Sequence, residues 1–320
     1  LFSSCETEFD VNAEWKETTV VYGLLDASLD TQLVRINKAY LGEIDALEMA
    51  QYSDSINFNP SNLEVKLHQL QYNEILESIT LDTILIIKDT LDANGNPAVF
   101  SVENNIIYQA LTPNGFLRGD RTYMLTIKNL ISGNEVSAST ELISGFSFES
   151  FNSSYKFGFY NGALPDSTKF RSKTIEWEKV YNGVIYQLDV RFNYLENGEL
   201  KHLTWNQGLV TFNGSLSMKT TLEGAKFFNF LSKELEDPVF QGTREFIDLD
   251  LVMTVGTEEL NTYIQLNEPI SGIVQQRPDF TNINNGIGIF SSRYTHSEFG
   301  INLTDDTRQY LIDELDRNFQ

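Results

Sequence analysis

The chain has 320 residues, of which 41% are hydrophobic and 12% aromatic, so it can bury a sizeable core and is not disordered by composition. Its 45 acidic and 23 basic residues give a formal net charge of -22, which repels phosphate groups and argues against a nucleic-acid partner. One cysteine and three histidines, far apart in the sequence, exclude an internal disulfide and a metal site built from several thiolates, and we expect neither a metal nor a cofactor.

The sole cysteine lies in a distinctive amino-terminal segment. Apolar and small residues at positions 1–4 precede Cys5, and the acidic stretch 6–10 follows it. This pattern resembles the lipobox of bacterial lipoproteins, and the resemblance implies a signal peptide and a lipid anchor such as palmitate on Cys5. The acidic stretch resembles the export signal of Bacteroidota surface lipoproteins. It implies a lipid-anchored protein exposed on the outer membrane, with residues 1–17 as signal-peptide remnant, lipobox and tether.

The first predicted domain spans residues 18–145 and consists of short strands separated by turn residues. Asn94-Gly95 and Gly133-Asn134 are typical of hairpin turns, and residues 45–51 are good helix formers. The predicted strands are residues 18–25, 32–36, 63–70, 79–88, 98–102, 123–129 and 135–142. This spacing predicts an immunoglobulin-like or fibronectin-like β-sandwich.

An aromatic segment, residues 145–162, marks the change of domain. Its aromatic residues recur at every second position, which predicts a strand buried at the seam between the domains. The alternative is that these rings form a platform for sugars.

The second predicted domain, residues 146–320, alternates apolar and polar residues most clearly over 184–194 and 247–255. Such alternation indicates antiparallel strands with one wet face. Asn182-Gly183 and Asn197-Gly198 predict hairpin turns that join residues 174–181 and 200–205 to the central strand.

Two helices are expected in this domain, near residues 221–236 and 305–317. The first is predicted from the capping-box spacing of Thr220 and Glu223, the second from acidic residues in its first turn. The glycines of Asn285-Gly286-Ile287-Gly288 lead into an apolar strand and permit a positive φ or a close backbone approach. We therefore expect a mainly β protein, a β-sandwich followed by an antiparallel β-rich domain with two or three helices.

The sequence contains no catalytic motif that binds a metal or phosphate or supplies an activated nucleophile. Asp248 with Asp250, and Glu176 with Glu178, fall on one strand face each, as expected of solvated surfaces. We therefore expect a protein that is not an enzyme.

Residues 284–290 and the VVYGLLD segment near the start resemble uncharacterised Bacteroidota surface lipoproteins with an amino-terminal sandwich domain. The resemblance implies a protein partner at the outer membrane, a β-barrel transporter of the TonB-dependent kind or an assembly complex. Ser55 and Ser167 lie in tripeptides that resemble the O-glycosylation sequon of that phylum.

The leading functional hypothesis is thus a non-enzymatic lipoprotein that binds an outer-membrane β-barrel protein or its cargo. The alternative is a glycan-binding lipoprotein of a nutrient-uptake system, and a glycosidase is the second alternative. The candidate sugar-contacting residues are Phe151, Tyr155, Tyr160, Trp177 and Trp205.

Overall fold

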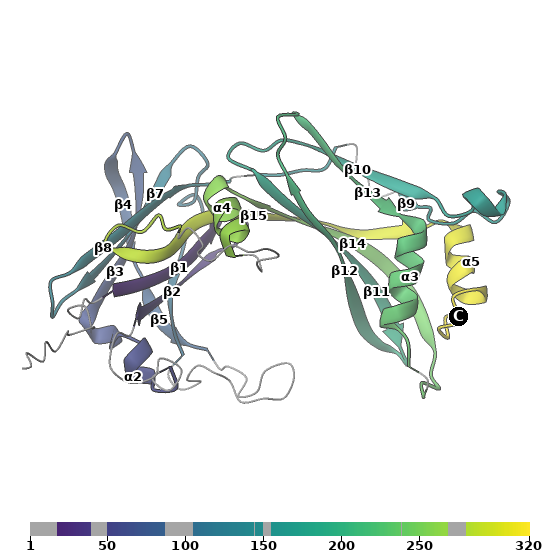
Figure 1. Ribbon diagram of the computed structural model, residues 1–320, viewed down its shortest axis with the longest axis horizontal. Coiled ribbons are helices and arrows are strands. Elements are labelled where there is room, and N and C mark those ends of the chain that lie inside the picture. The colour runs from purple at the N-terminus through teal and green to yellow at the C-terminus, as the bar shows by residue number, and fades with distance from the viewer. Residues whose placement is uncertain are drawn as a thin grey trace, which may run out of the picture. The chain divides into compact units, whose positions relative to one another are not determined.

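The computed structural model describes residues 18–39, 50–86, 105–143, 145–149, 155–237, 239–267 and 280–320. Within these residues the fold is mainly β, with antiparallel sheets and four helices, as the alternation predicts (Figure 1). The chain forms two compact units: unit 1 contains residues 1–25, 29–142 and 262–292, and unit 2 contains residues 26–28, 143–261 and 293–320.

Unit 1 is a β-sandwich of two sheets. One sheet has the strand order β15-β1-β2-β6-β5 and the other the order β4-β3-β7-β8. The strands are β1 (Thr18–Asp26), β2 (Thr31–Ala39), β3 (Leu63–Gln71), β4 (Glu74–Thr80), β5 (Asp82–Leu85), β6 (Ile106–Leu111), β7 (Thr122–Asn129), β8 (Glu135–Glu141) and the first part of β15 (Gly286–Leu303). The short helices α2 (Ser53–Ile56) and η1 (Pro60–Asn62) precede β3.

The predicted strand 79–88 is wrong as a single element. The chain ends β4 at Thr80 and starts β5 at Asp82, and the two strands belong to different sheets. Leu81 is the crossing point: its side chain is buried and its N–H donates to the carbonyl of Val65 at 2.9 Å. Strand β6 was not predicted, while the predicted strand 98–102, the Asn94-Gly95 turn and most of the predicted helix 45–51 lie outside the described residues.

The glycines that begin β15 allow it to approach β1 closely, as the sequence predicts. Gly288 has a φ of +111°, and a Cβ there would lie 2.1 Å from the carbonyl oxygen of Val21. A Cβ on Gly286 would lie 2.8 Å from the carbonyl oxygen of Thr19. Real Cβ atoms do not approach a backbone oxygen this closely, so both positions require glycine.

The larger antiparallel sheet of unit 2 has the order β12-β11-β14-β15, and its inner face is covered by a second layer. The layer contains the pair β10 and β13 and the helices α3 and α5 (Figure 1). The elements of unit 2 are β9 (Lys156–Phe157), η2 (Asp166–Thr168), β10 (Ser172–Glu178), β11 (Ile185–Glu196), β12 (Glu199–Thr211), β13 (Ser217–Glu223), α3 (Gly224–Glu234), β14 (Arg244–Gly256) and α5 (Asp305–Asp313). Strand β9 pairs in parallel with the end of β15.

The two predicted hairpin turns of this unit have different outcomes. Asn197 and Gly198 have φ angles of +52° and +85° and join β11 to β12, which confirms that prediction. The prediction at Asn182-Gly183 is wrong, because β10 pairs with β13 and not with β11. Asn182 still adopts a positive φ of 60°, so the dipeptide forms a turn. This turn connects β10, in the covering layer, to β11, in the larger sheet.

The predicted start of the first helix is also wrong. Residues 217–223 form β13, opposite β10, and α3 begins at Gly224. A Cβ at Gly224 would lie 2.3 Å from the carbonyl oxygen of Phe159 and 2.4 Å from that of Arg171, so the chain turns from strand to helix where a side chain cannot fit. The second predicted helix agrees with α5, whereas α4 (Glu258–Asn267) was not predicted.

Candidate ligand-binding groove

Two adjoining hollows in unit 2 lie along β10 and share Tyr155 and Lys173 in their linings, and we refer to the two together as the groove. Their volumes are about 170 Å³ and 600 Å³. The narrower hollow is lined by Phe148, Glu149, Tyr155, Lys173, Thr174, Ile175 and Glu176. The wider hollow is lined by Tyr155, Lys156, Gly158, Tyr160, Asn161, Arg171, Ser172, Lys173, Thr304, Asp305 and Asp306.

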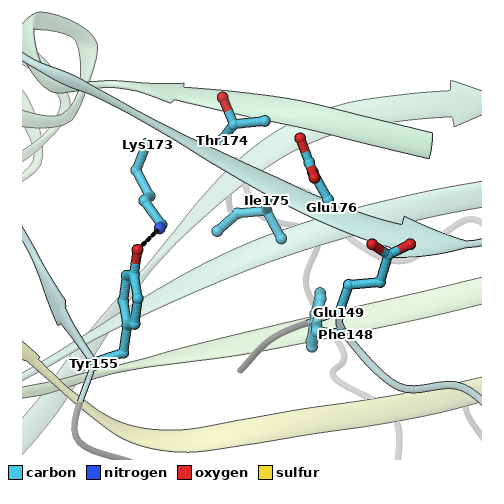
Figure 2. A pocket seen from close by; sticks show the side chains of 7 residues that line it. All are labelled: Phe148, Glu149, Tyr155, Lys173, Thr174, Ile175 and Glu176. Carbon is cyan, nitrogen blue, oxygen red and sulfur yellow. Dashed lines mark hydrogen bonds between the residues drawn. The ribbon is translucent and has the colours of Figure 1, made fainter. Parts of the chain in front are cut away.

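Tyr155 and Lys173 lie side by side at one end of the narrower hollow (Figure 2), and both also line the wider hollow. The Lys173 Nζ donates to the Tyr155 hydroxyl at 2.6 Å and lies 3.9 Å from the centre of the Tyr155 ring. The ring of Phe157, buried in the core, packs edge-on against Tyr155 at 6.4 Å between centroids. These contacts hold the Tyr155 ring in place while 41% of the residue stays exposed to a ligand.

The narrower hollow ends in two acidic side chains. Glu149 and Glu176 lie at the end away from Tyr155, with Ile175 between the two groups (Figure 2). The Glu149 N–H donates to the carbonyl of Glu176 at 3.1 Å, which ties the segment before Tyr155 to β10. Both carboxylates can accept hydrogen bonds from ligand hydroxyl groups.

The wider hollow is bounded by the start of α5 and by Tyr160. Thr307 Oγ1 accepts hydrogen bonds from the N–H groups of Phe159 and Tyr160 at 3.0 and 3.2 Å, which fixes this segment to α5. The Tyr160 ring packs against Tyr310 at 4.6 Å between centroids. Burial, with smaller effects of Glu314 and Tyr160, raises the pKa of the Tyr310 hydroxyl, so this support stays uncharged at neutral pH.

The groove therefore brings together two of the five aromatic residues proposed from the sequence, Tyr155 and Tyr160. Trp177 has 0% of its surface exposed and packs on Tyr186, so its ring offers no face to a ligand. Trp205 is partly buried against Phe227 and Phe230, on α3. Phe151 lies outside the described residues, as does the proposed lipid-attachment residue Cys5.

The two proposed O-glycosylation residues differ in exposure. Ser167 lies in the exposed turn η2. Ser55 lies in α2 and is half-buried, and its N–H donates to the carbonyl of Tyr52.

The acidic pair Asp248 and Asp250 does not form the solvated face that the alternation predicts, because Asp250 is only 6% exposed and Asp248 is half-buried. Asn193 Nδ2 donates to both carboxylates, at 2.7 and 2.9 Å. In the described part of the chain, no group of three or more histidine, cysteine or acidic residues is arranged to hold a metal ion.

The polar residues of the groove were not proposed as a site from the sequence. The alternation pattern indicates a solvated strand face for Glu176, and Glu149, Arg171 and Lys173 do not belong to any recognised sequence motif. They meet because residues 148–149 and 160 pair with β10 and the segment just before it, through the bridges Phe148–Trp177 and Tyr160–Phe170, and such non-local pairings leave no local sequence signal.

No family model and no curated protein matches the chain. A crystal structure of the CFA/I adhesin of enterotoxigenic E. coli is similar at 10% identity and a TM-score of 0.17, over 91% of this chain and 94% of the adhesin chain. A likeness at that score supports no inference about fold or function. Among the described helices, none combines the length and the apolar character needed to cross a bilayer.

Proposed function

We propose that the protein is a non-enzymatic binding protein that takes a saccharide in the groove along β10. The observation that carries the proposal is the exposed Tyr155 ring, held by Lys173 between two hollows lined with hydrogen-bonding groups. Sugars present both apolar ring faces and many hydroxyl groups, so an immobilised aromatic ring with acceptors and donors around it suits them. The anchor on Cys5 and the position on the outer membrane remain part of this proposal.

Calorimetric titration with a panel of neutral oligosaccharides tests the binding. Tyr155→Ala is expected to weaken the affinity about tenfold, because the variant loses roughly 1.4 kcal/mol of binding free energy from the contact between the sugar and the tyrosine ring. Tyr181→Ala is the matched control, because Tyr181 is exposed but does not line the groove. Equal affinities for the two variants, or no binding by the wild type, would contradict the proposal.

The same titrations separate binding from hydrolysis. Glu149 and Glu176 both line the narrower hollow, and a glycosidase uses two carboxylates. We expect no release of reducing ends on long incubation. Release that Glu149→Gln abolishes would replace the binding proposal with a glycosidase.

A protein partner is the second candidate, supported by apolar side chains exposed on unit 1. Tyr72 is 92% exposed at the turn between β3 and β4, and Ile75 and Leu76 on β4 are 53% and 52% exposed. Exposed apolar residues gathered in one hairpin are typical of contact surfaces. Purification from native membranes in mild detergent tests this proposal. Co-elution of the protein with a β-barrel protein, and loss of that co-elution in the double variant Tyr72→Ser/Leu76→Ser, would support a protein partner. Recovery of the protein alone would count against it.

Mass spectrometry of the same preparation tests the anchor. The expected product begins at Cys5 and carries acyl chains. Recovery of unmodified Cys5 with Leu1 still present would refute the anchor without affecting the groove.

A further inference from the structure

We infer that the groove selects a saccharide with an anionic group, a carboxylate or a sulfate, and that Arg171 binds this group. The inference rests on the proposed saccharide binding and specifies its ligand. It also gives the ligand a direction along the groove, with the anionic group in the wider hollow.

The wider hollow concentrates positive charge on an acidic protein. The chain has a net charge of -22, yet Lys156, Arg171 and Lys173 all line this hollow, against Asp305 and Asp306. Because the net charge of the chain is negative, three cations in one hollow create a local attraction for an anion.

Of these three cations, Arg171 is the one whose charged group has no partner among the described residues. Lys156 Nζ lies 3.4 Å from a carboxylate oxygen of Asp305, and Lys173 donates to Tyr155. Asp306 lies in the first turn of α5, where the helix dipole stabilises a negative charge. In the part of the chain that the structure describes, no hydrogen bond or ion pair is found for the Arg171 guanidinium, which is exposed.

The backbone of Arg171 is held on both sides. Its N–H donates to the carbonyl of Phe159, and its own carbonyl accepts from the N–H of Gly224, both at 2.9 Å. A guanidinium on a fixed backbone presents two parallel N–H groups, which match the two oxygens of a carboxylate or sulfate. Fixing the backbone lowers the entropy lost on binding.

The opposite end of the groove disfavours an anion. Glu149 and Glu176 line the narrower hollow, and among the described residues that line it Lys173 is the one basic side chain. An anionic group there would be repelled, whereas neutral hydroxyl groups can donate to both carboxylates. The two ends therefore favour one direction: the anionic group at Arg171, a sugar ring against Tyr155, and a neutral sugar at the glutamates.

Titration of the full chain with three oligosaccharides of equal length tests the inference: a neutral one, one with a uronate and one with a sulfate. The wild type is expected to bind at least one anionic ligand about tenfold more tightly than the neutral one. The comparison of uronate with sulfate identifies which anion is preferred.

Arg171→Gln is expected to remove this preference while keeping the affinity for the neutral ligand, which also shows that the variant is folded. Arg171→Lys should keep part of the preference, because lysine keeps the positive charge but lacks the two parallel N–H groups of the guanidinium. Lys233→Gln on α3 is the matched control and should leave the preference unchanged, since Lys233 lies outside the groove. If the neutral and anionic ligands bind equally well, or Arg171→Gln keeps the preference, the inference is wrong but the saccharide proposal stands. If none of the three binds, the saccharide proposal itself fails.

Discussion

Units 1 and 2 bury similar alternating strands in different ways. In unit 1 two sheets supply the core, which is mostly aliphatic with a few rings such as Phe116, Tyr123 and Phe290. In unit 2 one sheet packs under helices and a strand pair, and rings fill much of its core. Its buried aromatic residues are Phe146, Phe148, Phe157, Phe159, Trp177, Tyr186, Phe192, Tyr194, Phe227, Phe228, Phe246 and Phe319.

This difference shows that an alternating pattern does not determine which kind of element covers the apolar face of a strand. A strand with one apolar face requires a cover, but a second sheet and a helix meet that requirement equally well. In unit 2 the rings of α3 take part in this cover: Phe227 stacks on Phe159, and Phe228 packs against Tyr310 of α5. The exposed ring of Tyr155 continues this aromatic layer through Phe157 and Phe159.

The largest expected effect tests the close backbone approach in unit 1. Gly288→Ala adds a methyl group 2.1 Å from the carbonyl oxygen of Val21 at a φ of +111°. We expect a loss of about 4 kcal/mol of unfolding free energy, from overpacking and backbone strain together. Hydrogen exchange should show the loss in β1 and β2. Gly133→Ala, also at a positive φ but with no atom within 4 Å, should cost only about 1 kcal/mol.

The next prediction tests the aromatic layer of unit 2. Phe227 of α3 stacks on Phe159 at 4.4 Å between centroids and is buried. Phe227→Ala should cost about 3 kcal/mol, because the single-layer cover leaves a cavity above the sheet. Urea unfolding followed by tryptophan fluorescence in a Trp15→Phe background measures this, since the other two tryptophans, Trp177 and Trp205, belong to unit 2. Phe299→Ala, on an exposed ring of the same unit, is the control, and an equal loss there would argue against the layer.

The stability of unit 1 should depend on pH through His68. His68 is buried on β3, with its ring nitrogens 2.7 Å from Ser78 Oγ and 2.9 Å from Thr126 Oγ1. Burial, and then the charge of Lys66, lowers the pKa of His68 below its usual 6.5. The unfolded chain therefore binds more protons below pH 6.5, so stability is full above that pH and falls as the pH drops towards the folded-state pKa.

Urea unfolding of the wild type and of His68→Gln between pH 7.5 and 5.5 measures this effect. The wild type should lose more stability than the variant across the window, and hydrogen exchange should place the loss in β3 and β7. Parallel curves for the two proteins would show that His68 is not responsible.

The smallest expected effect compares two hairpin turns. Tyr72-Asn73 in unit 1 and Asn197-Gly198 in unit 2 both have positive φ at both central residues. Asparagine and glycine adopt this conformation at little cost, whereas tyrosine adopts it with backbone strain. Tyr72→Gly should therefore stabilise the protein by about 0.5 to 1 kcal/mol, measured by thermal unfolding. Gly198→Ala should destabilise it by about 1 kcal/mol, and a loss of stability in Tyr72→Gly would show that the ring makes a contact that offsets the strain.

The candidate groove could be predicted only in part. The period-2 pattern pointed to the aromatic segment that contains Tyr155, and left a buried strand and a sugar platform as alternatives. Only Lys156–Phe157 (β9) forms a strand in the described part of this segment; Phe157 and Phe159 are buried in the core, whereas Tyr155 is exposed beside the groove. Arg171 and Lys173 could not be assigned, because their role depends on which residues face them across the groove.

The sequence by itself determined most strands of unit 1 (β1, β2, β3, β7 and β8), the strands β10, β11 and β14 of unit 2, the turn at Asn197-Gly198, the close approach at Gly286 and Gly288, and helix α5. Each of these depends on local backbone geometry or on the alternation of one segment. Only the tertiary structure decided that β10 pairs with β13, that Leu81 crosses between sheets, and that residues 262–292 return to unit 1. Strand pairing joins distant residues through backbone groups that are the same in every residue, so side-chain patterns alone do not specify the partner.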